Sequence, residues 1–267
     1  MRTARFTGRT ALVTGAGAGF GRATAVGFAR DGAENVALVE RYPDRLDDVC
    51  KQIEAHGARA LPIATDLQNA ETAAAAVEAT VRGAGGLDIL VSNHVAMGRE
   101  VAFLDGTDAE WERELAVNLT SHYVLARTAA RAMRDAGKGG SIAFTASVDA
   151  LGAEEGFAGY CVTKAGLVAL SRVMAVELAE YGIRVNCVSP GPGDTQGSVD
   201  LMGEERMSHF RREGFAGVPL KRLASVDDIA EAFLYLASDA ASYVTGHNLI
   251  VDGGLTVYAY RVPEDES

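Results

Sequence analysis

The sequence has few cysteines, and their number and spacing exclude a disulfide framework and a zinc site. Cys50, Cys161 and Cys187 are the only three in 267 residues. An odd number with no C-x-x-C pair gives neither a disulfide framework nor a zinc site. Five scattered histidines, with no H-E-x-x-H pair, offer no catalytic metal site either. We therefore expect a reduced, cytoplasmic compartment and no metal cofactor.

Positive charge is also scarce, and it is nowhere clustered. Lys and Arg number 25 against 36 Asp and Glu, which gives a formal net charge of −11. Nucleic acids and anionic membranes bind clustered Lys and Arg, so we expect neither as a partner. No apolar run reaches the length of a membrane span, and the start, MRTARFTGRT, has no signal-peptide core. These absences predict a soluble, unprocessed protein.

What the sequence does contain is an alternation of short β-rich runs with longer helical patterns. Strands are expected at 10–15, 35–40, 59–65, 87–92, 140–147, 183–189 and 247–253. Helices are expected between them at 20–31, 44–56, 70–83, 108–136, 157–181 and 226–237. Such alternation predicts a parallel sheet with right-handed crossovers and helices on both faces. The predicted fold class is α/β, a doubly wound sheet of seven parallel strands.

No linker, repeat or low-complexity stretch divides the chain, so we expect a single domain over residues 1–267. The regular alternation is interrupted at 194–222, a polar segment with Gly and Met that follows the sixth expected strand. A long insertion beside the carboxyl ends of the strands is usually functional, and we predict a substrate lid there. The tail VPEDES is expected to fray.

The segment TGAGAGFG, residues 14–21, follows the first expected strand and opens the first expected helix. Its glycines allow a tight turn and close approach of the backbone to a pyrophosphate, which a helix N-terminus favours electrostatically. The same pattern without a ligand would be an ordinary glycine-rich turn. Its place in the first βα turn, where an open parallel sheet binds its nucleotide, favours a dinucleotide site at Gly15, Gly19, Phe20 and Gly21.

Glu40 ends the second expected strand. A carboxylate there accepts hydrogen bonds from the adenosine ribose hydroxyls and repels a 2′-phosphate, which favours NAD over NADP. Arg41, next to it, can pair with that phosphate, so NADP is the alternative cofactor. Without a cofactor, Glu40 and Arg41 would be a charge pair in solvent at the end of a strand. Asp66 and Leu67 follow the third expected strand, where Asp66 can bond the adenine amino group or cap the next turn.

In GYCVTKAG, residues 159–166, a helix places Tyr160 and Lys164 on one face about one turn apart. Tyrosine, with an ordinary pKa near 10, is a poor base at neutral pH. A neighbouring Lys ammonium favours the phenolate and lowers that pKa. The spacing alone also fits an ordinary amphipathic helix, but Ser147 precedes Tyr160 by thirteen residues.

Together these segments resemble the short-chain dehydrogenase/reductase family, in its single-domain NAD(P)-binding branch. The resemblance runs from Gly8 to VDGG at 251–254, with TGAGAGFG, Asp66, SNHV, AVNLT, Ser147, YCVTK, PGPGDT and TGHNLIVDGG in family order. It implies a Rossmann-type fold and an oxidoreductase that transfers a hydride between NAD(H) and a secondary alcohol or ketone substrate. An NADP-dependent ketoreductase and a nucleotide-sensing regulator without turnover are the alternatives.

The resemblance also implies catalytic roles. Tyr160 is the general acid/base, and Lys164 tunes it and holds the nicotinamide ribose. Ser147 donates a hydrogen bond to the substrate oxygen. Asn118, in AVNLT, holds a water that links Lys164 to a proton relay. The structural alternatives are a buried Ser at a strand end and an Asn bonded to backbone.

Further cofactor contacts are implied in PGPGDT, where Pro190 and Gly191 bring the backbone close to the nicotinamide and Thr195 bonds its carboxamide. The family usually reads N-N-A-G where residues 92–95 here read SNHV. Asn93 is retained and is expected beside the cofactor. His94 either packs with a satisfied imidazole or reaches the ribose or the substrate.

Asp149, Glu154 and Glu155 lie between Ser147 and Tyr160, in the region that lines the substrate cleft of the family. Our hypothesis is that at least one of these acids faces the substrate and favours a polyhydroxylated or cationic molecule. Solvated loop acids are the alternative. Family members usually assemble as tetramers through the long helices expected here at 108–136 and 157–181, so a homotetramer is expected.

Overall fold

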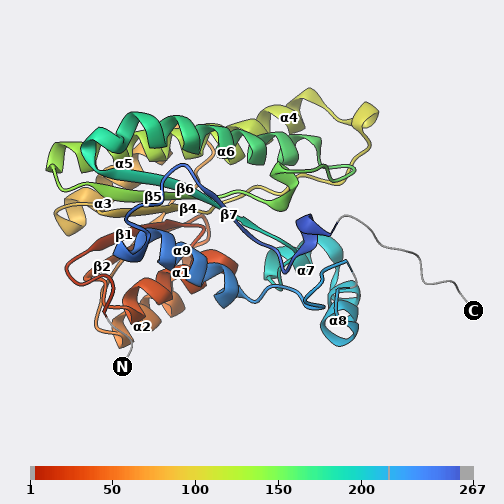
Figure 1. Ribbon diagram of the computed structural model, residues 1–267, viewed down its shortest axis with the longest axis horizontal. Helices are drawn as coiled ribbons and strands as arrows, with labels where there is room; N and C mark the ends of the chain where they lie inside the picture. Colours follow the sequence, from red (N-terminus) through yellow and green to blue (C-terminus); the bar gives the residue numbers. More distant parts are fainter. Residues whose placement is uncertain (1–3, 216, 259–267) are drawn as a thin grey trace, which may run out of the picture.

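A computed structural model describes residues 4–215 and 217–258, which form a seven-stranded sheet with helices on both faces (Figure 1). The strands are β1 (Thr10–Thr14), β2 (Asn35–Glu40), β3 (Arg59–Ala64), β4 (Ile89–Ser92), β5 (Gly140–Thr145), β6 (Ile183–Pro190) and β7 (Asn248–Val251). Their order is β3-β2-β1-β4-β5-β6-β7, and every neighbouring pair is parallel. The order reverses between β1 and β4, the position at which open α/β sheets bind ligands.

Two hydrophobic cores sandwich the sheet, because successive side chains of a strand point to opposite faces. One core packs α1 (Gly19–Arg30), α2 (Leu46–Ala55) and α9 (Val226–Ala237) onto Ala11 and Val13 of β1. The other packs α3 (Ala70–Ala84), α5 (Ser121–Ala136) and α6 (Ala158–Leu178) onto Leu12. Strands covered in this way read as continuous apolar runs, and the five residues of β1 are all buried.

The predicted fold class and all seven strands are confirmed. The helix expected at 108–136 is divided: α4 (Asp108–Leu115) passes through a π-helical turn (Ala116–Thr120) into α5. The segment 194–222 contains two helices that the sequence did not single out, α7 (Gln196–Met202) and α8 (Glu204–Glu213), at one end of the sheet (Figure 1). The tail VPEDES lies outside the described residues. Within the described ranges, no helix combines the length and apolar character needed to cross a bilayer.

Candidate active site

A cleft of about 750 Å³ opens at the carboxyl ends of the strands. It brings together most of the residues that the sequence singled out. Those that line it are Gly15, Gly19, Phe20, Glu40, Arg41, Asp66, Leu67, Asn93, His94, Ser147, Asp149, Glu154, Tyr160, Lys164, Pro190, Gly191 and Thr195. Gly21, Asn118 and Glu155 do not line it.

The glycine turn after β1 forms one end of this cleft. Gly15 and Gly19 have φ values of +62° and +53°, a region that favours glycine. A Cβ at Gly21 would lie 2.1 Å from the Gly15 carbonyl oxygen, so a side chain there would push the turn from the helix. No side chain caps the N-terminus of α1, and its first turn has no acidic residue. Its first N–H groups therefore suit an anion such as a pyrophosphate.

The Glu40 carboxylate fastens this turn to the end of β2. Its Oε2 accepts from the Gly17 N–H at 3.1 Å. Its Oε1 accepts from the backbone N–H groups of Arg41 (3.0 Å) and Tyr42 (3.1 Å). The carboxylate thus has a structural role in addition to facing the cleft.

Two guanidinium groups lie beside Glu40, around the ring of Tyr42. Arg41 and Arg45 lie 4.7 Å and 4.6 Å from the ring centre, and Arg41 also donates to the Tyr42 hydroxyl. Arg41 comes within 3.6 Å of Asp66. Tyr42 and Arg45 line the cleft as well, and the sequence analysis missed both. In the sequence, the spacing of four residues between Arg41 and Arg45 was the one pattern that could have indicated that the two guanidinium groups lie together.

Asn93 connects the ends of three neighbouring strands. Its Oδ1 accepts from the Thr145 hydroxyl of β5 at 2.8 Å, and its Nδ2 donates to the Thr14 carbonyl of β1 at 3.3 Å. Its backbone N–H donates to the Thr14 hydroxyl at 2.8 Å. These bonds hold the floor of the cleft.

Both ring nitrogens of His94 have partners. The Thr14 hydroxyl accepts from the backbone N–H groups of Asn93 and His94, so its hydrogen goes to His94 Nδ1 at 2.9 Å. The Ser121 hydroxyl donates to the Val117 carbonyl at 2.6 Å, so it accepts from His94 Nε2, also at 2.6 Å. Burial and the Lys164 charge lower the pKa of His94 to about 3. This arrangement supports the packing interpretation of His94.

His122 of α5 stacks on His94, with ring centres 3.9 Å apart and planes at 10°. Its Nε2 donates to the His94 carbonyl at 3.0 Å, and its Nδ1 accepts from the Ser92 hydroxyl at 2.7 Å. The ring is fully buried, and burial holds its pKa well below the usual value. No local motif marks His122, because its partners lie on β4 and the loop that follows.

Asn118 lies in the π-helical turn and is fully buried. Its Oδ1 accepts from the Ala96 N–H at 2.8 Å, and its Nδ2 donates to the Ala96 carbonyl at 2.9 Å. Both ends of the amide are therefore bonded to backbone, the alternative that the sequence left open. Interruptions of this kind in a helix are frequent at functional sites.

Ser147, Tyr160 and Lys164 together line one part of the cleft, here called the Ser–Tyr–Lys wall. The Lys164 Nζ donates to the Thr145 carbonyl at 2.7 Å and lies 5.3 Å from the centre of the Tyr160 ring. Burial lowers the pKa of Lys164 to about 8. Burial also raises the pKa of Tyr160 above its usual value, and a hydrogen bond with the Ser147 oxygen offsets this in part. The Tyr160 pKa is thus raised by desolvation, whereas the Lys spacing predicted a lowering.

Two acids complete this wall. The Ser147 hydroxyl donates to Asp149 Oδ2 at 2.8 Å, and the Asp149 N–H donates back to Ser147 Oγ at 3.2 Å. Burial raises the pKa of Glu154, and the negative charge of Asp149 raises it further. Arg113 and Arg206 also line the cleft, and no sequence motif marks either of them.

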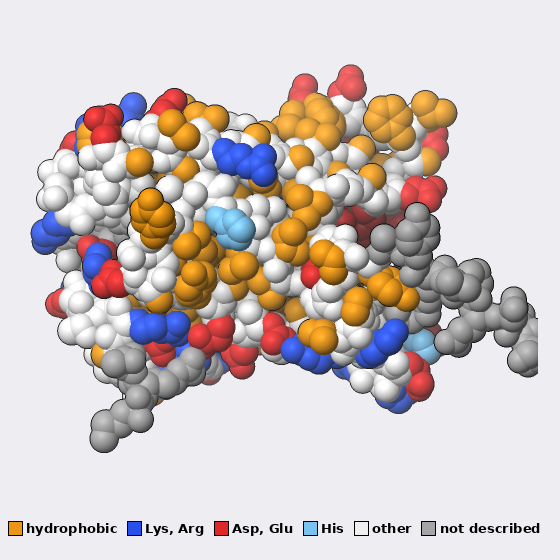
Figure 2. Space-filling model, in the orientation of Figure 1, with side chains coloured by type: hydrophobic (Ala, Val, Ile, Leu, Met, Phe, Trp, Pro, Cys, Tyr) orange, Lys and Arg blue, Asp and Glu red, His pale blue; other side chains and the backbone are white. Residues whose placement is uncertain are grey.

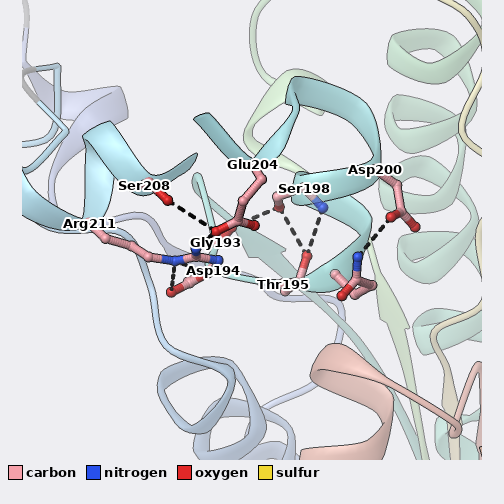
Figure 3. Close-up of polar contacts among 9 residues, drawn as sticks. Gly193, Asp194, Thr195, Ser198, Asp200, Glu204, Ser208 and Arg211 are labelled. Carbon is pink, nitrogen blue, oxygen red and sulfur yellow. Dashed lines mark hydrogen bonds and ion pairs between the residues drawn. The ribbon is translucent and has the colours of Figure 1, made fainter. Parts of the chain in front are cut away.

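Thr195 is the N-cap residue of α7 and is bonded to Ser198 (Figure 3). Its hydroxyl oxygen accepts from the Ser198 N–H at 3.1 Å, and the Ser198 hydroxyl donates to the Gly193 carbonyl at 2.7 Å. The Thr195 hydrogen is therefore donated to Ser198 Oγ at 3.0 Å, which leaves Thr195 one acceptor position. A Cβ on Gly19 would lie 3.7 Å from Thr195, so this loop meets the glycine turn across the cleft.

Arg211 of α8 binds back onto the same loop (Figure 3). Its guanidinium donates to both carboxylate oxygens of Asp194, with the shortest distance 2.7 Å, and to Glu204 Oε1 at 2.7 Å. The Gly191 N–H donates to the Val251 carbonyl at 3.0 Å. These contacts fix the loop between β6 and α7.

The cleft fits a dinucleotide by its own geometry. The uncapped N-terminus of α1 suits a pyrophosphate, and Glu40 and Thr195, which line the cleft beside this turn, offer acceptors. A volume of about 750 Å³ is in the range of cofactor sites. Within the described chain, no group of three His, Cys, Asp or Glu side chains is arranged to hold a metal. A parallel sheet with this turn at its switch point and a Ser–Tyr–Lys wall defines the class of dinucleotide-dependent α/β enzymes.

Comparison with known proteins gives the family. A family model described as enoyl-(acyl carrier protein) reductase matches residues 15–256. L-Rhamnose 1-dehydrogenase (NAD(P)(+)) of Sphingomonas sp. is 39% identical over 94% of this chain and 97% of its own length. The chain belongs to the short-chain dehydrogenase/reductase family.

Solved structures agree. Carveol dehydrogenase from Mycobacterium avium in complex with NAD superimposes with a TM-score of 0.86 at 27% identity, covering 95% of this chain and 99% of that one. A Beutenbergia cavernae protein, provisionally named an NAD(P)-dependent gluconate 5-dehydrogenase and holding NADP at low occupancy, gives 0.85 at 35% identity, covering 95% and 99%. Relatives of this chain thus use both NAD and NADP.

Proposed function

We propose that this protein is an NAD-dependent oxidoreductase that transfers a hydride between NAD(H) and a secondary alcohol or ketone, with Tyr160 as general acid/base. The observation that carries the proposal is the wall of Ser147, Tyr160 and Lys164 in the cleft that also contains the glycine turn. Relatives named as dehydrogenases support the reaction class. A nucleotide-sensing regulator would need the turn but not these three side chains.

The dinucleotide supplies the hydride acceptor or donor when bound, and the protein supplies the proton chemistry. In oxidation the Tyr160 phenolic oxygen takes the proton of the substrate hydroxyl, and in reduction it returns that proton. The Ser147 hydroxyl donates to the substrate oxygen, where negative charge develops. Lys164 places a positive charge beside Tyr160. The water relay through Asn118 stays a prediction, and the bonds from its amide to Ala96 favour a positioning role.

Tyr160→Phe tests the catalytic assignment, because it removes the hydroxyl and keeps the ring. We expect kcat/KM for NAD reduction with a panel of secondary alcohols, sugars, dihydrodiols and hydroxysteroids to fall at least about a hundredfold. The Kd for NAD should be almost unchanged. Tyr123→Phe, on the exposed surface of α5, is the matched control and should retain activity. Wild-type turnover by Tyr160→Phe would show that another residue moves the proton.

We propose NAD as the preferred cofactor because the Glu40 carboxylate faces the cleft after β2 and repels a 2′-phosphate. NADP is the second candidate, favoured by the two guanidinium groups of Arg41 and Arg45 around Tyr42. The ratio of kcat/KM for NAD to that for NADP decides between them, and a wild-type preference for NADP contradicts the proposal. Glu40→Gln should shift the ratio toward NADP by about tenfold, whereas exposed Glu34→Gln should not.

We further propose that residues 1–267 act as one domain in which 194–222 is the substrate lid. Leu201, Met202, Arg206 and Phe215 of this segment line the cleft, which supports the lid assignment. Limited proteolysis of 194–222 with and without NADH and a substrate analogue tests it, because a lid becomes protected when the ternary complex forms. Equal cleavage in both states would contradict a closing lid.

A homotetramer in the cytoplasm is our proposal for the assembly. Val173 and Val176 of α6 are 55% and 81% exposed, which is high for valine. Figure 2 shows hydrophobic side chains gathered over α9 and β7. In the segment that joins these two elements, Tyr243 is fully exposed. Such surfaces suit subunit contacts. Light scattering after size exclusion should give four times the 28.0 kDa chain mass, and a monomer at micromolar concentration would contradict this. Three unpaired cysteines support the reducing compartment.

A further inference from the structure

We propose that the substrate carries a second hydroxyl group on the carbon next to the reacting carbon, and that Asp149 is the residue that selects it. The inference rests on the proposed function, because it concerns the same cleft and the same Ser147. It identifies the substrate as a vicinal diol, with the α-hydroxy ketone as the product of its oxidation.

The Ser147 hydroxyl can make few hydrogen bonds, because it has one hydrogen and two lone pairs. Its hydrogen is donated to Asp149 Oδ2 at 2.8 Å. One lone pair accepts from the Asp149 N–H at 3.2 Å. For Ser147 to donate to the oxygen of a substrate, its hydrogen must therefore leave Asp149.

When the Ser147 hydrogen leaves, the Asp149 carboxylate loses this hydrogen-bond donor. None of the salt bridges between Arg and a carboxylate in residues 4–215 and 217–258 includes Asp149. Its charge acts on the buried Lys164, whose pKa it raises. The neighbour of Asp149 on the other side is a second acid, Glu154, whose pKa is raised by burial, by the charge of Asp149 and by a hydrogen bond with Asp149, so the Ser147 bond is the one that Oδ2 loses. Both acids also raise the pKa of Tyr160. A carboxylate that loses its donor inside a cleft is destabilised by the full loss of that hydrogen bond.

A second hydroxyl of the substrate can replace Ser147 as the hydrogen-bond donor to Asp149. Oxygens on adjacent carbons of a gauche diol lie within hydrogen-bond distance of each other, as Ser147 Oγ and Asp149 Oδ2 do. One substrate oxygen then meets Ser147 and Tyr160, and the neighbouring hydroxyl donates to Asp149. A mono-alcohol offers no such donor. Because a site built to bond a hydroxyl discriminates against the analogue that lacks it, Asp149 gives the cleft a preference for the diol.

The test compares matched alcohols that differ by the second hydroxyl: 1,2-cyclohexanediol with cyclohexanol, and 2,3-butanediol with 2-butanol. Wild-type kcat/KM with NAD should favour the better diol isomer by about tenfold, since part of the Asp149 surface faces the open cleft. Asp149→Ala should bring this ratio close to one, mainly by raising KM for the diol. Asp149→Asn keeps the shape and one acceptor oxygen and should give an intermediate ratio.

Glu155→Ala is the matched control, because it removes the same charge from the same loop but at a side chain that does not line the cleft. It should retain the wild-type ratio. Equal use of diol and mono-alcohol by the wild type, or an unchanged ratio in Asp149→Ala, overturns the diol assignment while the proposed function stands. A preference for 2-aminocyclohexanol over the diol also overturns it. Failure of the wild type to oxidise any alcohol of the panel with either cofactor contradicts the proposed function itself.

Discussion

Burial shifts the pKa values of Tyr160 and Lys164 in opposite directions, and each shift disfavours the charged form of the side chain. The pKa of Tyr160 is raised and that of Lys164 is lowered to about 8, both chiefly by desolvation. At neutral pH the phenol is therefore protonated, which suits reduction, while oxidation needs the small deprotonated fraction.

From these shifts we expect kcat/KM for alcohol oxidation to rise by up to about tenfold per pH unit from pH 6 to 8. Above about pH 8 the Lys164 ammonium begins to lose its charge, so the rise should flatten. Ketone reduction should stay nearly constant between pH 6 and 8. Initial rates in both directions across pH 6–10 check this, and an oxidation rate that falls between pH 6 and 8 is incompatible with it.

The stacked pair of His94 and His122 links acid stability to the cleft. His122 is neutral when folded and has its pKa held well below the usual value by burial. In the unfolded chain the ring takes up a proton near pH 6.5. Below that pH the unfolded state binds a proton that the native state does not, so the free energy of unfolding falls as pH decreases.

His122→Gln should remove this term. We expect the free energy of unfolding of the variant to fall less steeply between pH 6 and 5, by about 1.4 kcal/mol per pH unit. Urea unfolding at several pH values measures the slope. Ser92→Ala removes the hydrogen bond to the ring but keeps the titrating group, so it should be less stable with the wild-type slope. The same slope in His122→Gln and wild type would refute the linkage.

At the scale of the residue, the sequence was sufficient where the spacing is local. Tyr160 and Lys164 share a helix, and Ser147 closely follows the strand before it, so the cleft contains all three. It was insufficient where partners come from separate elements. The bonds from His94 to Thr14 and Ser121, and the stacking on His122, depend on three elements that meet only in the folded sheet.

At the scale of the element, the turn into α1 depends on a missing side chain. A Cβ on Gly21 would lie 2.1 Å from the Gly15 carbonyl oxygen and 2.6 Å from Asn93 Nδ2. Backbone cannot move away as a flexible side chain does, so the turn and the start of the helix must separate.

Gly21→Ala should therefore weaken NAD binding by at least about tenfold and lower the free energy of unfolding by about 1–3 kcal/mol. Titration calorimetry and urea unfolding measure the two effects. Gly86→Ala is the matched control, because no atom lies within 4 Å of its added Cβ. It should bind NAD as the wild type does. Wild-type affinity in Gly21→Ala would mean that this glycine is not needed for the turn.

The elements themselves differed in how far they could be predicted. Buried parallel strands are apolar on both faces, so runs such as ALV in β1 stand out in the sequence. The helices α7 and α8 are short and polar, and α8 buries only Met207. Their positions depend on contacts such as that of Arg211 with Asp194, which no local sequence pattern predicts.

At the scale of the whole molecule, the cleft is assembled from both halves of the sheet, and its ligand should stabilise the whole chain. A ligand at a hundred times its Kd adds about 2.7 kcal/mol to the free energy of unfolding. For a chain of this length we expect NAD at that concentration to raise Tm by about 5–10 °C. Differential scanning fluorimetry measures the shift, with Gly21→Ala, which should show a much smaller one, as the comparison. No shift with either NAD or NADP would contradict a dinucleotide site.

The meeting of the glycine turn with the loop at Thr195 has a consequence for how the protein is made. Gly19 and Thr195 are 176 residues apart in the chain, yet the site needs both segments. Contacts so distant in sequence form late, after the chain entropy of closing a long loop has been overcome. A growing chain on the ribosome therefore has no complete nucleotide site until β6 and the start of α7 have emerged. Until then the cofactor gives little protection, and the exposed apolar strands are open to aggregation.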